Sequence, residues 1–273
     1  MYSTQLTDYH HYDVQNLIFQ RPDRHHSDRL QRVRIMTHHL DGTRGDLILS
    51  TPRLLSYGLQ EQFDPVGKQL VGYQLPLVMW GRKGPSEEET QFIKAMHDIT
   101  EVCKDFLVEN REEFDKPHLT KNELHRLNPL YYKMEKGKIV EDRPPLLYAK
   151  LNVYRNENQV QIRTLFTDEI TKETIDPTLL LNRRCFIYGA VRLESLLVGN
   201  KVSIQVKLFE ARVRLLDSGF KSLLEPGMTF KKNSKTRLPN QHHHSASTSS
   251  GKSVEEENTA TPTDEKKMAI ESI

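Results

Sequence analysis

One expected strand, within YAKLNVY at residues 148 to 154, carries an unusual set of side chains on its outward face. At the two-residue period of a β-strand, its apolar row is an ordinary core face. That row consists of Leu147, Ala149, Leu151 and Val153. The opposite row consists of Tyr148, Lys150, Asn152 and Tyr154. Because a solvated face needs no tyrosines and a buried face excludes an unpaired lysine, this row suits a flat ligand that carries negative charge.

Aromatic and basic residues also alternate on the outward faces of the neighbouring strands. We expect strands over residues 146 to 155, 159 to 166, 184 to 194 and 201 to 216. Nucleic-acid bases stack on tyrosine and phenylalanine, while lysine and arginine follow the phosphates. The candidate stacking residues are Tyr148, Tyr154, Tyr188 and Phe209. The candidate phosphate contacts are Lys150, Arg155, Arg163, Arg192, Lys207, Arg212 and Arg214.

This pattern favours a single strand over a duplex. A duplex is usually read by a helix in its major groove, and the one strong helix expected here begins with acidic residues and has no basic face. Two other interpretations of the same residues stay open. The aromatics can pair across strands or cover a second small core while the cations are solvated. They can also form the docking surface of a structural or scaffold protein for a protein partner.

Residues 86 to 112 are expected to form that helix. Ser86 and Glu89 have the spacing of a capping box, which satisfies the first backbone N–H groups. Apolar residues then recur at steps of three and four, as on the buried face of a helix. These residues are Phe92, Met96, Ile99, Cys103 and Phe106.

The whole pattern predicts a mainly β fold, a small closed or half-closed barrel of five to six strands with one helix and disordered termini. The last expected strand must bend. Its inward row changes phase after Phe209 and Glu210, and a change of one residue predicts a β-bulge, with which barrel strands turn corners. The row runs Val202, Ile204, Val206 and Leu208, and then Ala211, Val213 and Leu215.

Both ends of the chain are polar. Residues 1 to 45 are rich in His and Arg and are expected to form a flexible arm, followed by the folded domain at 46 to 225. Residues 226 to 273 hold too few apolar side chains to order themselves, so we expect a disordered tail, basic first and then acidic. A tethered acidic segment can occupy a cationic groove or bind a partner protein. The tail residues expected to bind partners are Glu255, Glu256, Glu257, Asp264 and Glu265.

Catalytic and metal-binding patterns are weak in this sequence. It contains no Walker A, GxSxG, HExxH or GxGxxG motif, so we expect no enzyme activity. Asp168, Glu169 and Glu173 have the chemistry to hold Mg²⁺ for a nuclease, but a solvated loop is the expected state. The paired histidines lack a coordination pattern, and Cys103 and Cys185 form no metal motif. We therefore expect neither a metal nor a cofactor.

The composition does not identify a binding partner, but it does indicate where in the cell the protein is found. A formal net charge of +2 does not by itself indicate nucleic-acid binding. No apolar run approaches the roughly 20 residues that cross a bilayer, and the N-terminal residues lack the apolar core of a signal peptide, so we expect no membrane partner. Two isolated cysteines fit a reducing compartment. These features predict an intracellular protein.

Two segments resemble a known family. They are RPPLLYAKLNVYRNENQVQIRTLFTDE at 143 to 169 and DPTLLLNRRCFIYGAVRLESLLVGNKVSIQVKLFEARV at 176 to 213. Both are similar to the single-stranded DNA-binding proteins of nucleocytoplasmic large DNA viruses, in particular the early proteins of that type in iridoviruses. The most characteristic pieces are PPLLYAKL, FTDE and ESLLVGNKVSIQVKLFEA.

The resemblance implies an OB-fold-like barrel, similar to that of phage replication single-strand binders, with the α-helix inserted between strands. It also implies an acidic C-terminal tail for protein contacts and for modulating DNA binding. It implies a non-enzymatic protein that coats single strands during viral replication, recombination and repair, in the nucleus or a cytoplasmic viral factory of the host cell. The implied partners are single-stranded DNA and, through the tail, viral replication proteins; a homodimer is left open. A viral structural or scaffold protein is the alternative. The tail departs from the family pattern because it mixes Lys266 and Lys267 with its acidic residues and ends in Ile273.

Overall fold

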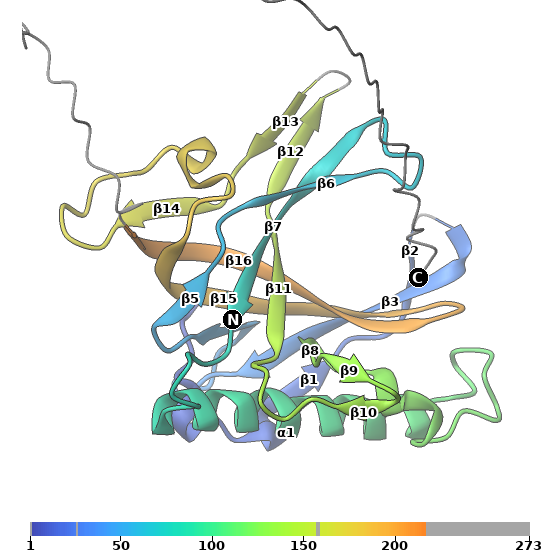
Figure 1. Ribbon diagram of the computed structural model, residues 1–273. Helices are drawn as coiled ribbons and strands as arrows, with labels where there is room; N and C mark the ends of the chain where they lie inside the picture. The colour runs from blue at the N-terminus through green and yellow to red at the C-terminus, as the bar shows by residue number, and fades with distance from the viewer. Residues whose placement is uncertain (1, 26, 157–158, 217–273) are drawn as a thin grey trace, which may run out of the picture. The chain divides into compact units, whose positions relative to one another are not determined.

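The structure, a computed structural model, describes residues 2–25, 27–156 and 159–216 (Figure 1). Most regular structure in these residues is strand, which confirms the prediction of a mainly β protein. The predictions for the tail, including Glu255, Glu256, Glu257, Asp264 and Glu265, lie outside the described residues.

The described residues contain the α-helix α1, with one group of strands before it and another after it. The helix α1 spans Glu87–Glu109, and the 3₁₀ helices are η1 (Tyr9–His11), η2 (Val14–Asn16), η3 (Glu123–Arg126) and η4 (Pro177–Leu180). The strands before α1 are β1 (Leu17–Phe19), β2 (Asp23–His25), β3 (Ser27–His38), β4 (Arg44–Ser50), β5 (Leu54–Ser56), β6 (Gln60–Phe63) and β7 (Leu70–Val78). The strands after it are β8 (Leu130–Tyr131), β9 (Met134–Glu135), β10 (Lys138–Ile139), β11 (Leu146–Leu151), β12 (Val153–Asn156), β13 (Gln159–Ile162), β14 (Leu165–Asp168), β15 (Cys185–Val198) and β16 (Val202–Leu215).

Five strands form a closed succession of pairings, called here the five-strand ring. β15 pairs with β5, β5 with β7, and β7 with β11, each antiparallel. β11 then pairs in parallel with β16, and β16 pairs antiparallel with β15. β3 and β4 also pair with β15, and β14 pairs with β16. The two long strands therefore pair directly with β3, β4, β5, β11 and β14.

The predicted bulge in the last strand is present. Ala190 of β15 lies opposite Glu210, but its neighbour Val191 lies opposite Leu208, so Phe209 is the extra residue. Inward-facing residues on the two sides of Phe209 are buried at even positions before it and at odd positions after it. The phase change read from the sequence is therefore confirmed, and the bulge bends β16 as the ring requires.

The helix begins as its sequence predicts. The Ser86 hydroxyl accepts a hydrogen bond from the Glu89 backbone N–H, and the Glu89 carboxylate accepts one from the Ser86 N–H. Four residues of the predicted apolar stripe are fully buried, namely Phe92, Met96, Ile99 and Cys103. Phe106 is only partly buried and stacks on Phe19 of β1, with ring centroids 4.2 Å apart. α1 thus covers one side of the sheet next to β1 (Figure 1).

The expected polar arm at residues 1 to 45 needs correction. Val33 and Ile35 of β3 are fully buried in the core, and β3 pairs with both β4 and β15. Polar and basic residues alternate with these apolar ones, and for this reason the sequence analysis did not identify the strand.

The expected strand 146 to 155 also needs correction. It is interrupted at Asn152, whose backbone C=O accepts a hydrogen bond from the Arg163 N–H. The expected strand 159 to 166 is divided into β13 and β14.

Both cysteines lie in the core. Cys103 of α1 and Cys185 of β15 are fully buried and form no disulfide. Burial raises the pKa of the Cys103 thiol to about 12 and that of Cys185 to about 11. Two neutral thiols of this kind behave as small apolar core residues.

Ile35→Ala tests whether β3 belongs to the core. The substitution leaves a cavity at a fully buried position, so we expect the free energy of unfolding to fall by about 2–5 kcal/mol. Urea titration followed by circular dichroism measures this change. Leu40→Ala is the matched control, because Leu40 is fully exposed in the turn after β3 and should change stability by less than about 0.5 kcal/mol. Equal changes in the free energy of unfolding for Ile35→Ala and Leu40→Ala would contradict the assignment of β3 to the core.

Candidate nucleic-acid interface

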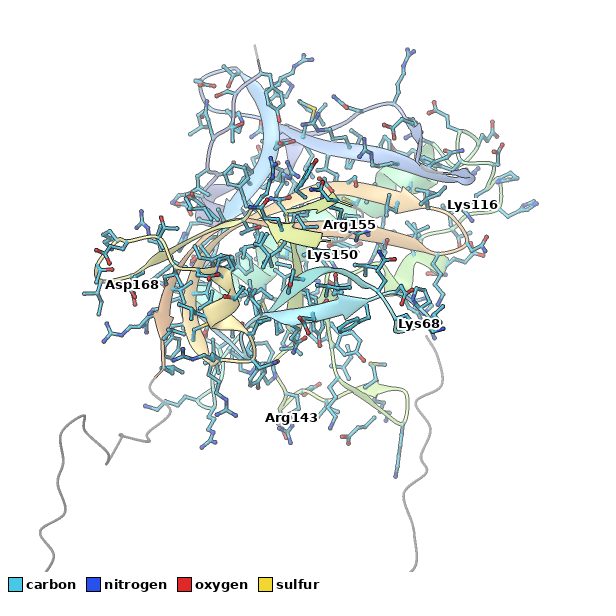
Figure 2. The ribbon with its side chains drawn as sticks, turned by 90° about the horizontal axis from the view of Figure 1, so that it is seen from above. Lys68, Lys116, Arg143, Lys150, Arg155 and Asp168 are labelled. Carbon is cyan, nitrogen blue, oxygen red and sulfur yellow. The ribbon has the colours of Figure 1, made fainter. Side chains whose placement is uncertain are left out.

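A row of polar side chains crosses five adjacent strands on the outer face of the sheet. Neighbours in this row lie opposite each other in the strand register. The row, called here the polar strip, consists of Gln60 (β6), Gln74 (β7), Lys150 (β11), Lys207 (β16) and Arg192 (β15). Figure 2 shows Lys150 between β6 and the β15–β16 pair. Three of the five are cations that the sequence analysis selected, and the two glutamines were not anticipated.

The glutamine end of the strip is held by amide hydrogen bonds. The Gln74 side-chain NH₂ donates to the Gln60 side-chain oxygen at 3.2 Å. The Gln74 oxygen accepts from the Gln62 NH₂ at 2.8 Å. Each amide keeps further donor and acceptor capacity, because one amide side chain can form about four hydrogen bonds.

The cations of the strip are oriented by nearby side chains. Lys150 Nζ donates to the Gln205 side-chain oxygen at 3.0 Å. Lys207 Nζ lies 2.9 Å from Glu194 Oε1, and the Arg192 guanidinium also donates to this oxygen. Glu194 therefore holds two of the three cations in place.

Asp46 extends this network to β3 and β4. Its carboxylate lies 3.2 Å from Arg192 Nη1 and 2.8 Å from Arg34 Nη2, and its side chain is only 8% exposed. Burial alone would raise the pKa of Asp46. Hydrogen bonds from Tyr2 and Arg34, with the charges of Arg34 and Arg192, instead lower that pKa below its ordinary value.

The network carries an excess of positive charge. Four cations, Arg34, Lys150, Arg192 and Lys207, face two carboxylates, Asp46 and Glu194, which leaves a net charge of +2. Burial, and then the nearby Lys207 ammonium, lowers the pKa of Lys150, although Glu194 partly offsets this. Lys150 also has no carboxylate partner among the described residues. An anion that reached Lys150 would relieve this repulsion.

Aromatic side chains flank the strip along β11. Tyr148 is on the same outward face as Lys150 and is 36% exposed. The Tyr131 ring of β8 meets it edge-on, with centroids 6.2 Å apart. Tyr131 is 63% exposed and was missed by the sequence analysis, because a strand of two residues has no readable periodicity.

The other predicted contacts on the β11 side lie on the β12–β13 hairpin. Tyr154 is 47% exposed, and the Arg163 guanidinium carbon lies 4.8 Å from the centroid of its ring. Arg155 is exposed on the same hairpin. This distance places the Arg163 cation within range of a cation–π interaction with the ring.

The remaining predicted contacts form a separate group beside β14. Tyr188 and Arg212 lie opposite each other and line a pocket of about 410 Å³ together with Leu165. Phe209 is the exposed bulge residue, and Arg214 lies two residues beyond Arg212 on β16, opposite Phe186. None of the strip residues lines this pocket. The eleven predicted contacts therefore occupy two areas of the outer face.

The acidic loop after β14 is organised by its own backbone. The Asp168 carboxylate accepts hydrogen bonds from the N–H groups of Ile170 and Thr171, both at 2.8 Å. Glu169 pairs with Arg53 at 3.3 Å. Within the part of the chain that the structure describes, no group of three His, Cys, Asp or Glu has the geometry of a metal site. The metal-dependent nuclease interpretation thus receives no geometric support in these residues.

Comparison with known proteins assigns the chain to a family. A family model described as "Protein of unknown function (DUF2738)" matches residues 10–250. The chain belongs to this family. The uncharacterized protein 007R of Invertebrate iridescent virus 3 is 30% identical over 165 residues, which are 59% of this chain and 34% of that protein. The early 31 kDa protein of Frog virus 3 (isolate Goorha) is 32% identical over 170 residues, 60% of this chain and 62% of that protein.

These relatives confirm the expected relationship to iridovirus proteins, one of which is an early protein. The chain spans less than two thirds of the length of either relative. DNA binding stays a prediction. Separately, none of the helices in residues 2–25, 27–156 and 159–216 has the length and apolar character needed to cross a membrane.

Asp46→Asn tests the charge network at the strip. The substitution removes the carboxylate that two arginines share, so we expect the free energy of unfolding to fall by about 1–3 kcal/mol at neutral pH. Because the folded-state pKa of Asp46 is lowered, its stabilisation is present above the unfolded pKa of about 4 and is lost as the pH falls through the folded pKa. Urea unfolding of both proteins across this pH range measures the difference.

The control for this experiment is Asp98→Asn. Asp98 pairs with Lys94 on the exposed face of α1, and such surface pairs contribute less than about 1 kcal/mol. A cost of Asp46→Asn that persists unchanged at acid pH would contradict the role assigned to its charge.

Proposed function

We propose that this chain is a non-enzymatic single-stranded DNA-binding protein with an OB-like barrel. It coats and protects single strands during viral DNA replication, recombination and repair. The observation that carries the proposal is the outer face of β11, where Tyr148 lies two residues from Lys150, which belongs to a row of amides and cations. A base stacks on the tyrosine while the phosphates follow the cations.

The strand order supports the fold part of this proposal. In chain order the strands of the ring are β5, β7, β11, β15 and β16, and the third pairs in parallel with the fifth. OB folds are five-stranded Greek-key barrels that bind oligonucleotides on the face of their second and third strands. In the ring these are β7 and β11, the strands that carry Gln74, Tyr148 and Lys150.

The electrostatics of the strip support a strand of phosphates rather than a single tightly held anion. Among the residues that the structure describes, Lys150 is the cation of the strip without a carboxylate partner, so a first phosphate binds there at low cost. Further phosphates must compete with Glu194 for Lys207 and Arg192, which are partly exposed. Such competition makes binding moderate at each position and strongly dependent on salt.

The biological setting rests on the relatives. The early protein of Frog virus 3 supports a role early in infection, and genome replication is the early process that exposes single strands. We place the protein inside the host cell, in the nucleus or in a cytoplasmic viral factory, with viral replication proteins as its protein partners.

Titration with oligo-dT and with a duplex of equal length tests the function. We expect binding to the single strand alone, and the logarithm of the affinity should fall linearly with the logarithm of salt concentration, by about 0.7 per phosphate contact. Fluorescence anisotropy of labelled DNA at two salt concentrations measures this. A surface built for a protein partner would bind neither DNA, and that result would support the scaffold alternative through the exposed Tyr131 and Tyr148.

Tyr148→Ala combined with Tyr154→Ala tests the stacking platforms. Each lost stack costs about 1–3 kcal/mol, so we expect single-strand binding to weaken by a few kcal/mol while the fold persists. Both side chains are substantially exposed, which protects stability. The variant with phenylalanine at both positions retains the ring faces and should bind nearly as well as the native chain. Unchanged affinity of the folded alanine variant would exclude these two platforms.

A further inference from the structure

A second aromatic and cationic pocket lies outside the polar strip. It has a volume of about 790 Å³, within the range of roughly 300–1,000 Å³ that is typical of small-molecule sites. The turn after β7, the segment before β11 and the residue before β15 contribute to its walls. We call it the turn pocket, and its characteristic lining residues are Tyr57, Trp80, Arg82, Lys83, Arg143 and Arg184.

The cations of the turn pocket differ from those of the strip because no carboxylate or amide side chain among the described residues holds them. Among the described residues, no hydrogen bond or ion pair engages the side chains of Arg82, Lys83, Arg143 or Arg184. Two carboxylates, Glu141 and Asp142, also line the pocket, which leaves a net charge of +2. Unpaired cations that converge on a concave surface are available to bind an anion.

The aromatic residues supply a flat apolar surface beside these cations. Trp80 is the only tryptophan in the chain and is half-buried. Tyr57 is 43% exposed, and the Arg184 guanidinium carbon lies 5.8 Å from the centroid of its ring. Leu55 and Val78 form apolar wall between them. A ligand that matches both parts has an aromatic ring system and negative charge.

The turn pocket lies on the same outer face as the polar strip. Gln74, Pro76 and Val78 of β7 are alternate residues on that face, and their partners on β11 are Lys150, Tyr148 and Leu146. Pro144, two residues before Leu146, lines the pocket. At about 3.3 Å per residue, the six residues from Lys150 to Pro144 span roughly 20 Å. A single strand of several nucleotides bridges this distance.

We propose that the turn pocket binds a nucleotide, with the base against Trp80 and the phosphate among the four cations. A free nucleotide and a nucleotide within a single strand present the same chemistry. The position of the pocket favours the strand that lies on the polar strip, and this part of the inference rests on the proposed function. The pocket then lengthens the binding path beyond Tyr148 and Tyr131.

Trp80 fluorescence provides a direct measurement, because no other tryptophan contributes to the signal. The native protein is titrated with thymidine monophosphate and with oligo-dT of about 4 and about 16 nucleotides, the limits of site size for one OB fold. We expect the longer oligonucleotide to quench Trp80 at much lower concentration than the mononucleotide. Equal quenching per nucleotide by all three ligands would assign the pocket to free nucleotides instead.

Paired substitutions separate the pocket from general electrostatic attraction. Arg143→Ala with Arg184→Ala removes two pocket cations, and we expect the salt slope for the longer oligonucleotide to decrease by about 1.4, that is, about 0.7 for each lost phosphate contact. The control is Arg111→Ala with Arg126→Ala, which removes the same charge from exposed arginines beyond the C-terminal end of α1. The control should leave the slope unchanged.

The stacking part is tested at Trp80 itself. Trp80→Leu keeps an apolar side chain against the core but loses the aromatic face, and we expect affinity for the longer oligonucleotide to fall about 5- to 150-fold, as for one lost stack. Trp80→Phe should largely retain the affinity. Both variants keep an apolar residue at position 80, so we expect both to fold. Circular dichroism checks this and separates a loss of affinity caused by unfolding from one caused by the lost stack.

The outcomes distinguish the inference from the proposed function. Binding of oligo-dT without quenching of Trp80, and with an unchanged slope in the Arg143 and Arg184 variant, would overturn the turn pocket but leave single-strand binding intact. Quenching by an oligoglutamate peptide at the same concentrations would also overturn it, because such a peptide offers charge without bases. Binding of the mononucleotide without binding of oligo-dT would contradict the proposed function and retain the pocket as a nucleotide site.

Discussion

The ladder between β15 and β16 is the constraint on which the rest of the sheet depends. These two strands of 14 residues pair along nearly their whole length, and between them they hold β3, β4, β5, β11 and β14. Two straight strands would not reach partners in so many directions. The extra residue Phe209, and a second register shift between Leu193 and Ser195, turn the ladder so that one end meets β3 and the other meets β5. The outer face that carries Lys150, Lys207 and Arg192 follows from this bend.

The outer face carries two kinds of cations: those paired with carboxylates in the polar strip, and those without such partners among the described residues in the turn pocket. In the polar strip, Glu194 and Asp46 hold Arg192 and Lys207 in defined positions, so a ligand exchanges one anion for another. In the turn pocket no hydrogen bond or ion pair among the described residues holds the cations, so a ligand would have to order them at a cost of up to about 2 kcal/mol each. Positions that are ordered in advance favour geometric selectivity, whereas positions that are ordered on binding tolerate variation in the ligand. The proposed coating of strands of any sequence would benefit from the second kind.

Sequence reasoning was reliable where a short pattern determined the local structure. The capping box at Ser86, the buried helix face from Phe92 to Cys103 and the bulge at Phe209 each depend on neighbouring residues, and all three were read correctly. The strand β3 was missed although Val33 and Ile35 alternate with arginines, because the surrounding histidines and arginines lowered the mean hydropathy. The link between Asp46 and Arg192 joins residues far apart in the chain and has no local signature. The same is true of the turn pocket, which four separate segments build.

The burial of both cysteines has a practical consequence for studies in solution. Thiol reagents are electrophiles that react with the thiolate, which is the nucleophile. The raised pKa values of Cys103 and Cys185 keep both thiols protonated near neutral pH, inside the core and away from solvent. A cysteine introduced at an exposed position would therefore be labelled selectively by a maleimide dye, with both native residues left in place. Fluorescent probes can be placed site by site around the outer face, and energy transfer from such probes would report which part of that face a labelled ligand occupies.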